Sequence, residues 1–323
     1  MKRLLMIVNP HVGQGQIKYK LADVLDLCVK AGYRVEVHIT QGAGDATAAA
    51  KRRGAHVDRV ICTGGDGTLD ETINGLMQLP PEKRPELGYI SSGTTNDFAH
   101  SLKLPARILD AAQVAISGDL SPIDVGRVND AWFCYLVGFG AFTEVSYATS
   151  QALKRQLGHT AYIMEAAKEL MDLKPCHVRA EIGEEIFDSD FLCGFVSNSN
   201  RVAGMSGIWG KNIEMDDGLF EVTLIRMPTD IVGWGEAVTA LLSPDVRSNL
   251  VIRRKANHLH FFSEAPVDWV KDGEFAGSFT EVEVEVLRRS IRIMRKPGTA
   301  ATAGKQSESA AKPAESAEIS EKI

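Results

Sequence analysis

The feature that most constrains the fold of this chain is a glycine-rich turn, Gly-Gly-Asp-Gly-Thr, at residues 64–68. An apolar run at 60–62 leads into the turn, and a helical spacing of Leu69, Ile73 and Leu76 leads out of it. A strand, a tight turn and a helix therefore follow one another within about twenty residues. Glycine lets a backbone approach a phosphate closely, and the N–H groups that open the next helix face the anion. Asp66 within the turn repels phosphate, which indicates that a metal ion or a reacting hydroxyl is also held there.

Strand and helix patterns alternate through the first part of the chain. Strands are expected at 4–8, 34–39, 59–62 and 87–90, and helices at 17–29, 43–53 and from the glycine turn to about residue 78. Such alternation predicts a doubly wound α/β domain, a parallel sheet with helices on both faces. Ligands bind at the carboxyl ends of such strands. Polar or glycine-rich turns follow the strands at 9–15, 40–44, 64–68 and 92–97. Their convergence predicts a nucleotide site at this edge.

From about residue 124 the pattern changes to short strands. We expect a strand pair or one long strand at 132–142 and a helix at 144–173. Further strands are expected at 177–182, 186–190, 192–197, 219–225, 258–262, 280–286 and 291–294. Strict alternation of polar and apolar residues at 280–286 is typical of an antiparallel strand with one solvent-exposed face. The second part is thus predicted to be a mostly antiparallel β domain. Residues 297–323 contain no aromatic residue, and we expect a disordered tail there.

Composition limits the partners and the compartment. A formal charge of −6 over 323 residues argues against a nucleic-acid binder. The longest nearly apolar run, at 131–142, is too short to span a bilayer, and the N-terminus lacks a signal-peptide pattern, so any membrane contact should be peripheral. The five cysteines form no CxxC pair, which favours reduced thiols in a cytoplasmic protein.

Acidic residues beside glycines or in turns form a second group of candidates: Asp66, Asp97, Asp124, Asp216, Asp217, Asp272 and Glu274. Phosphoryl transfer needs carboxylates that hold Mg²⁺ and a group that accepts a proton from the attacking hydroxyl. Taken singly, the acidic turn at 271–274 is more typical of a surface turn, and that at 215–219 is either a surface turn or a cation site. Neither a Walker-type GxxxxGK[ST] loop nor a Rossmann GxGxxG motif at the first turn is found in the sequence.

Two further groups have alternative interpretations. His258 and His260 lie on one face of a strand, where a zinc pair competes with an ordinary strand whose histidines have partners. We favour the latter because a third ligand is not evident. A set of apolar residues among glycines would line an acyl-chain cleft, touch a membrane, or simply pack in the core: Met205, Ile208, Trp209, Ile231, Val232 and Trp234.

Together these motifs resemble the diacylglycerol kinase catalytic-domain family, in particular its soluble bacterial lipid kinases, and are similar also to sphingosine kinases. The matching residues run in family order over about 1–295: Asn9-Pro10 with Gly13 and Gly15, Gly64 to Thr68, Asn74-Gly75, Gly93-Thr94, Asn96 to Ala99, Asp217-Gly218-Leu219 and Asp272-Gly273-Glu274. Gly-Gly-Asp-Gly alone is less specific, since NAD kinases and phosphofructokinases resemble it there.

The resemblance implies an NAD kinase-like α/β nucleotide domain at 1–127, completed by strands at about 281–296, and a β-sandwich acceptor domain at 128–280. It implies that Glu274 accepts the proton, with Asp272 beside it and Asp66 organising phosphate and metal. ATP would be held by Asn9, Pro10, His11, Val12, Gly13, Thr40, Gly65, Asp66, Gly67, Thr68, Leu69, Asp70, Glu71 and Thr94. Asp66, Asp97 and Asp124 match acids near the phosphates and Mg²⁺. Asp217, the Leu219 carbonyl and Glu214 match a structural Mg²⁺ site.

The chain departs from the family pattern at two places. Asp70 stands where the family usually has Asn, and residues 210–214 lack the Pro-x-Ala that usually precedes Asp-Gly, which puts the structural Mg²⁺ site in question. Neither change removes a catalytic acid.

The expected function is ATP-dependent phosphorylation of a lipid hydroxyl, diacylglycerol giving phosphatidic acid, by a cytoplasmic protein that associates transiently with the membrane. Phosphatidylglycerol, a sphingoid base and NAD are alternative acceptors, since the motifs hold ATP and not the acceptor. A non-catalytic nucleotide-binding scaffold is the third alternative. The oligomeric state, a homodimer for instance, is left open by the sequence.

Overall fold

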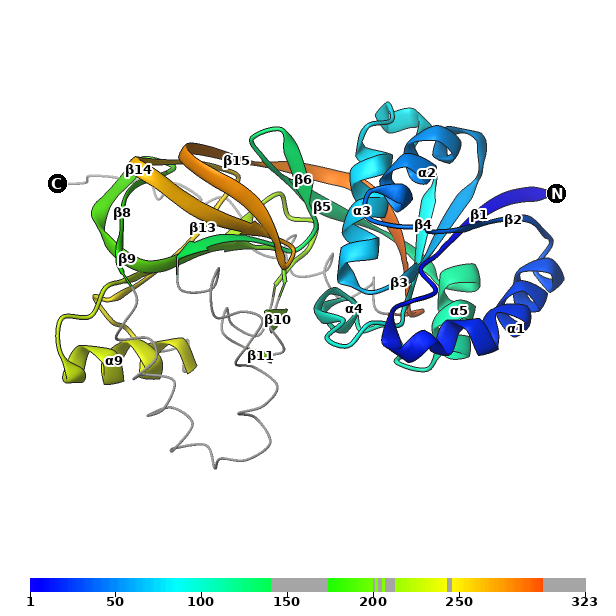
Figure 1. The fold of residues 1–323 in the computed structure, drawn as a ribbon, viewed down its shortest axis with the longest axis horizontal. Helices are drawn as coiled ribbons and strands as arrows, with labels where there is room; N and C mark the ends of the chain where they lie inside the picture. Colours follow the sequence, from blue (N-terminus) through cyan, green and yellow to red (C-terminus); the bar gives the residue numbers. More distant parts are fainter. Residues whose placement is uncertain (141–173, 200, 203–204, 207–212, 243–245, 299–323) are drawn as a thin grey trace, which may run out of the picture.

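The computed structural model describes residues 1–140, 174–199, 201–202, 205–206, 213–242 and 246–298 (Figure 1). The predicted helix at 144–173 and nearly all of the predicted disordered tail at 297–323 lie outside these residues. Figure 1 shows the described residues as two lobes joined by the long strand β15.

Parallel strands form the first part of the sheet in the order β2-β1-β3-β4: β1 (Lys2–Val8), β2 (Tyr33–Ile39), β3 (Arg59–Gly64) and β4 (Glu86–Ser91). Helices α1 (Gln16–Lys30) and α5 (Ile108–Ser117) cover one face, and α2 (Asp45–Arg53) and α3 (Asp66–Met77) cover the other. The predicted doubly wound α/β fold is confirmed.

Strand β1 shows why this part of the sequence is apolar without alternation. Leu5 and Ile7 pack in the core beneath α2 and α3, whereas Leu4, Met6 and Val8 pack in the core beneath α1 and α5. Successive side chains of a strand point to opposite faces, so a strand covered on both faces must be apolar at every position.

Several short elements complete this lobe: the 3-10 turns η1 (Gly13–Gly15), η2 (Gly54–His56) and η3 (Pro81–Lys83), and helix α4 (Asp97–Ser101). Strand β5 (Asp119–Val128) follows α5 and was not expected from the sequence. It is antiparallel to β15 (Glu274–Arg295) and forms a hairpin with β6 (Ala131–Phe133).

The second lobe is antiparallel, as predicted, and its main strands lie in the order β13-β12-β9-β7-β14-β15. Their bounds are β7 (Leu136–Gly140), β8 (Cys176–Ile182), β9 (Glu185–Ser197), β12 (Phe220–Arg226), β13 (Val251–Ala256) and β14 (His258–Lys271). Strands β7 and β8 lie end to end between β9 and β14, because Gly140 pairs with Cys193 and Cys176 pairs with Phe191. The described chain also contains the small pair β10 (Arg201–Val202) and β11 (Met205–Ser206) and helix α9 (Ile231–Leu242).

The antiparallel sheet curves until strands from its two ends face each other. Phe133 of β6 and Phe220 of β12 meet with ring centroids 5.5 Å apart, edge to face. Phe139, Phe261 and Trp269 pack together within the same core. Burial of these large rings between two β layers is the main source of stability expected for a sandwich.

Strand β15 joins the two lobes into one sheet. Its first part pairs with β14, its later part pairs with β5, and Ile293 pairs in parallel with Leu87 of β4. The strands expected separately at 280–286 and 291–294 are thus one strand, interrupted by a bulge between Leu287 and Ile291. Likewise, 186–190 and 192–197 are both parts of β9. Because β15 begins at Glu274, it anchors that residue to both lobes.

Candidate active site

The glycine turns at the carboxyl ends of β1, β3 and β4 pack backbone against backbone. Gly13 has φ +60°, and a Cβ placed there would lie 1.6 Å from the Ser92 carbonyl oxygen. A Cβ on Gly93 would lie 2.8 Å from the Gly65 Cα. Only glycine permits such contact. The predicted convergence of these three turns at one sheet edge is therefore seen directly.

Side chains tie the turns together. Asn9 Nδ2 donates a hydrogen bond of 3.0 Å to Thr68 Oγ1, which joins the first turn to the start of α3. Asn96 adopts φ 50° and exchanges hydrogen bonds with the backbone of Gly93, at 2.9 Å and 2.7 Å, which closes the turn after β4. These contacts hold the loops in place without using the backbone N–H groups of the first turn of α3.

The start of α3 has the chemistry expected for holding a phosphate. Its N-cap is Gly65, which has no side chain to cap the helix. The first N–H groups of a helix have no partner within the helix and carry its positive end. Together with the packed glycines, they fit the triphosphate of a nucleotide.

The residues predicted to hold the nucleotide do not all face the start of α3. Pro10, His11, Val12 and Thr94 do lie at least partly exposed in the glycine turns. The hydroxyl of Thr40 is buried and hydrogen-bonded to the Val8 carbonyl at 3.3 Å.

Three residues of α3 face elsewhere, so for their side chains the prediction of nucleotide contact lacks support from the geometry. Leu69 is buried in the apolar core. The Asp70 carboxylate is paired with Lys271. The Glu71 carboxylate accepts hydrogen bonds from the backbone N–H groups of Gly44 and Ala46, at 2.7 Å and 3.1 Å, and thereby caps α2.

Asp66 and Asp97 are adjacent acids at the centre of the turns. The N–H of Asp97 donates to Asp66 Oδ2 at 2.9 Å, so Asp66 caps α4. Burial raises the pKa of Asp66 to about 6; the hydrogen bond from Asp97 lowers it and the Asp97 carboxylate raises it. Asp97 is itself buried, with its Oδ1 3.0 Å from Arg201 Nε of the second lobe. A divalent cation would relieve the repulsion felt by Asp66, so its donor chemistry fits a metal.

Glu274 approaches this cluster from the other lobe. Its Oε1 lies 3.0 Å from the position that a Cβ on Gly67 would occupy, directly over the first turn of α3. The residue is exposed and opens strand β15. A carboxylate presented by one lobe to the phosphate-binding turn of the other can accept a proton from a group held between them.

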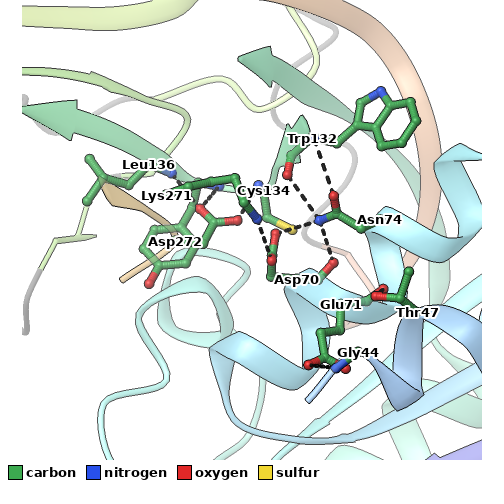
Figure 2. A network of polar contacts seen from close by, with 11 residues as sticks. Gly44, Thr47, Asp70, Glu71, Asn74, Trp132, Cys134, Leu136, Lys271 and Asp272 are labelled. Atoms are coloured by element: carbon green, nitrogen blue, oxygen red, sulfur yellow. Dashed lines mark hydrogen bonds and ion pairs between the residues drawn. The ribbon is translucent and has the colours of Figure 1, made fainter. Parts of the chain in front are cut away.

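Asp272 stands beside Glu274 in the sequence, but its carboxylate is held by backbone N–H groups. Its carboxylate accepts three backbone hydrogen bonds, from Cys134 at 2.5 Å, Tyr135 at 3.0 Å and Leu136 at 2.9 Å (Figure 2). The residue is only 4% exposed. Both oxygens are thus engaged, which favours a positioning role for Asp272 over the expected assistance to proton removal.

The acids predicted for metal sites lie in two separate places. Asp97 is in the glycine cluster. Asp124 lies on β5, where its carboxylate accepts the N–H of Gly218 and the N–H of Arg289, both at 2.7 Å. Its charged neighbours are Asp217 and Asp216, whereas those of Asp66 are Asp97 and Asp272. The expected place of Asp124 near the phosphates therefore finds no support.

The predicted ligands of the structural Mg²⁺ belong to the segment that contacts Asp124 through Met215 and Gly218. Asp217 Oδ1 accepts the N–H of Leu219 at 2.9 Å, and its other oxygen is 3.4 Å from Lys255 Nζ. Glu214 is exposed. Within the described parts of the chain, one group of three side chains brings together atoms of the kind that bind metals. It consists of Asp70, Cys134 and Asp272. The ammonium of Lys271 already supplies a cation there.

The two ambiguous sequence features are partly resolved. His258 pairs across the strands with Glu283 at 2.9 Å and His260 with Glu281 at 2.8 Å, which confirms an ordinary strand with partnered histidines. Of the apolar set, Trp234 is buried in the core whereas Val232 is 74% exposed. Ile208 and Trp209 lie outside the described residues.

Sequence reasoning missed Lys271 and Arg201, which bind acids of the first lobe from the second. One signal existed for Lys271: an additional acid at residue 70 must find a cation if it is buried.

Comparisons with known proteins agree with this geometry. The diacylglycerol kinase catalytic domain matches residues 3–128. A diacylglycerol kinase from Bacillus subtilis is 35% identical over 298 residues, which is 92% of this chain and 97% of the relative. This chain belongs to the diacylglycerol kinase family. Another diacylglycerol kinase, from Staphylococcus aureus strain MRSA252, is 34% identical over 278 residues, 85% of this chain and 87% of its own length.

Solved structures of the diacylglycerol kinase family share the fold. A Bacillus anthracis protein assigned as a diacylglycerol kinase superposes with TM-score 0.77 at 25% identity, over 91% of this chain and 97% of its own. An NAD kinase from Archaeoglobus fulgidus, at 12% identity, has TM-score 0.51 over 91% of this chain and 94% of its own. This second similarity concerns the fold alone. Family membership makes the chain a kinase, with ATP and a divalent metal implied. None of the helices in the described residues has the length and hydrophobicity needed to cross a bilayer.

Proposed function

We propose that this protein is an ATP-dependent lipid kinase that phosphorylates the free hydroxyl of diacylglycerol and produces phosphatidic acid. The observation that carries the proposal is the position of Glu274 over Gly67, because a carboxylate of the second lobe there lies close to the start of α3. The names of the relatives support diacylglycerol as the acceptor.

The nucleotide is held by the packed turns. Backbone N–H groups at the start of α3 bind phosphate oxygens, with Asn9 and Thr68 fixing the first and third turns against each other. Asp66 and Asp97 would hold Mg²⁺, which would supply neutralisation of phosphate charge. In this proposal the first-lobe residues 1–127, completed by about 281–296, bind ATP, and residues 128–280 bind the acceptor.

Glu274 accepts the proton as the acceptor hydroxyl forms its new bond to the γ-phosphorus. The bond between that phosphorus and the bridging oxygen of ADP breaks in the same transfer, so the products are phosphatidic acid and ADP. Asp272 does not touch the reacting atoms; it holds the turn from which Glu274 projects.

The acceptor enters from a membrane surface. Phe275, next to Glu274, is 67% exposed and offers an aromatic ring where the lipid must approach. The five cysteines are free thiols, which suits the cytoplasm, and contact with the membrane is peripheral and transient in this proposal. Asp217, the Leu219 carbonyl and Glu214 are proposed as ligands of a structural Mg²⁺.

An assay with a panel of acceptors tests the proposal. The purified protein, Mg²⁺ and ATP radiolabelled on its γ-phosphate are incubated with diacylglycerol, phosphatidylglycerol, sphingosine or NAD, the lipids in mixed micelles. Labelled phosphatidic acid is the expected product. Label on another acceptor would replace diacylglycerol, and an absence of label on every acceptor would favour the nucleotide-binding scaffold.

A matched pair of variants tests the role of Glu274. Glu274→Gln removes the proton acceptor at constant size and should lower kcat by about 100-fold, within the range of general-base catalysis. Glu264→Gln changes an exposed acid of the partner strand β14 and should leave kcat unchanged. Both should unfold at the wild-type temperature. Full turnover in Glu274→Gln would reject this residue as the base.

A further inference from the structure

A buried ion pair crosses the boundary between the two lobes. Lys271 Nζ, at the end of β14, lies 2.5 Å from Asp70 Oδ2 in the second turn of α3. The two side chains are 15% and 9% exposed. Burial works to lower the pKa of Lys271, but the carboxylates of Asp70 and Asp272 raise it above its ordinary value. Burial, and then the neighbouring Asp272 carboxylate, raise the pKa of Asp70, which Lys271 lowers.

Lys271 ends β14 at the hairpin that leads into β15, and Asp272 also holds this hairpin in place. Asp272 and Gly273 form a two-residue turn in which both residues have positive φ, 48° and 87°, and Lys271 pairs with Glu274 across it. This is the geometry of a type I′ hairpin. Asp272 binds three backbone N–H groups of the segment between β6 and β7. Figure 2 shows Lys271 and Asp272 meeting Asp70 from α3.

Asn74 extends the contact one turn further along α3. Its Nδ2 donates to Asp70 Oδ1 at 2.8 Å and to the Trp132 carbonyl at 3.0 Å (Figure 2). Asp70 is therefore fixed on both oxygens, one to Lys271 and one to Asn74. Helix α3 presents its start to Glu274 and its second and third turns to Lys271 of β14 and Trp132 of β6.

The charges around residue 70 are arranged about one cation. Asp70 is paired with Lys271, and a carboxylate oxygen of Asp272 lies within 4.8 Å of one of Asp70. Asp272 in addition accepts three backbone N–H groups. Removing one member of a buried pair leaves the other charge without compensation.

We propose that the Asp70–Lys271 ion pair is a positioning contact for catalysis, which clamps the Asp272–Gly273 hairpin against α3 and so holds the Glu274 carboxylate over Gly67. This inference rests on the proposed function, in which Glu274 is the base. Lys271 acts through Glu274 and does not touch the reacting atoms.

The test is a double-mutant cycle with Asp70→Asn, Lys271→Met and the double variant, measured as kcat, KM for ATP and ATP affinity well below each unfolding temperature. Each single variant should lower kcat at least ten-fold, and the double variant should fall no further than the worse single variant, because one contact is lost in all three. ATP affinity should change less than two-fold. Hydrogen exchange at residues 271–276 should become faster, which reports the loosened hairpin without any assay of activity.

Controls separate positioning from general stability and from the proposed function. Arg254→Met breaks an exposed pair with Glu185 in the second lobe and should alter neither kcat nor exchange at the hairpin. Wild-type kcat in both single variants, with Glu274→Gln impaired, would overturn the positioning role alone. Wild-type turnover in Glu274→Gln would instead overturn the proposed base. If Lys271→Met fails to fold, Asp70→Asn and Lys271→Arg carry the same comparison, with the arginine expected to keep most of kcat.

Discussion

Glu274 Oε1 lies 3.0 Å from the point where a Cβ of Gly67 would stand, and this contact joins the first residue of β15 to the first turn of α3. Glu274 comes more than two hundred residues after Gly67 in the chain. The strand that begins at Glu274 then runs back into the first lobe, where Ile293 pairs with Leu87. The contact is thus held by a continuous sheet.

Gly67→Ala should separate activity from stability. The new methyl group would displace the Glu274 carboxylate, and kcat should fall about ten-fold, as expected from a small misplacement of a catalytic group. Alanine suits a helix better than glycine by up to about 1 kcal/mol, so thermal stability should be unchanged or slightly raised. The control is Gly235→Ala in α9, where a Cβ meets nothing within 4 Å. An undiminished kcat in Gly67→Ala would mean that Glu274 is not confined at this point.

Gly13→Ala should damage both folding and nucleotide binding. Its backbone is left-handed and its Cβ would overlap the Ser92 carbonyl, so we expect a loss of roughly 2–4 kcal/mol in unfolding free energy, together with weaker ATP binding. Gly44→Ala is the matched control, because Gly44 has φ +78° but an added Cβ meets nothing within 4 Å. Urea unfolding and ATP titration measure both effects. Equal losses in the two variants would show that backbone strain alone, and not the contact between turns, is responsible.

Asp66 should make stability depend on pH in the absence of nucleotide and metal. Its pKa is about 6 in the folded protein against 3.8 for the ordinary side chain, so the folded state binds this proton more tightly. The stability that this provides is fully present below about pH 3.8 and is lost as the pH rises through about 6. At pH 8, Asp66→Asn should therefore have a higher unfolding free energy than wild type, by up to about 3 kcal/mol, and should unfold at a higher temperature. The difference should shrink towards pH 4.

Thermal unfolding of both proteins in EDTA between pH 4 and 8 provides this measurement. Titrating groups that do not interact with Asp66 are common to the two proteins and cancel in the difference. A difference that stays constant with pH would contradict the raised pKa of Asp66. Addition of Mg²⁺ and ATP should stabilise wild type more than Asp66→Asn at pH 8.

Asp124→Asn should destabilise the junction of the lobes. The carboxylate accepts one N–H from the turn after Asp217 and one from Arg289, whose φ is 51° at the bulge of β15. An amide has a single acceptor oxygen, so one N–H loses its partner at a cost of about 1–3 kcal/mol. Asp119→Asn on the same strand is the control, since Asp119 is exposed. If the two variants have the same urea midpoint, Asp124 does not hold this junction.

The glycine turns illustrate how far local pattern predicts a site. Each follows a buried strand, and parallel strands bring their carboxyl ends to one edge, so the meeting of Gly13, Gly65 and Gly93 was predictable. Strand β5 and the continuity of β9 and β15 were not. A long strand that crosses from a core to an edge changes its exposure pattern, and bulges such as that at Leu287–Ile291 resemble strand ends in a sequence.

The amino-acid sequence by itself determined the doubly wound sheet, the antiparallel second lobe and the place of the glycine turns, because apolar periodicity and glycine act over a few neighbouring residues. Only the tertiary structure decided what each acid does. Asp66 faces Asp97, Asp70 faces Lys271, Asp272 faces backbone N–H groups, and Asp124 joins two turns far from it in the chain. The role of a carboxylate depends on the donors and charges around it, and β14 and β15 supply two of these, Lys271 and the Arg289 N–H, from far along the chain.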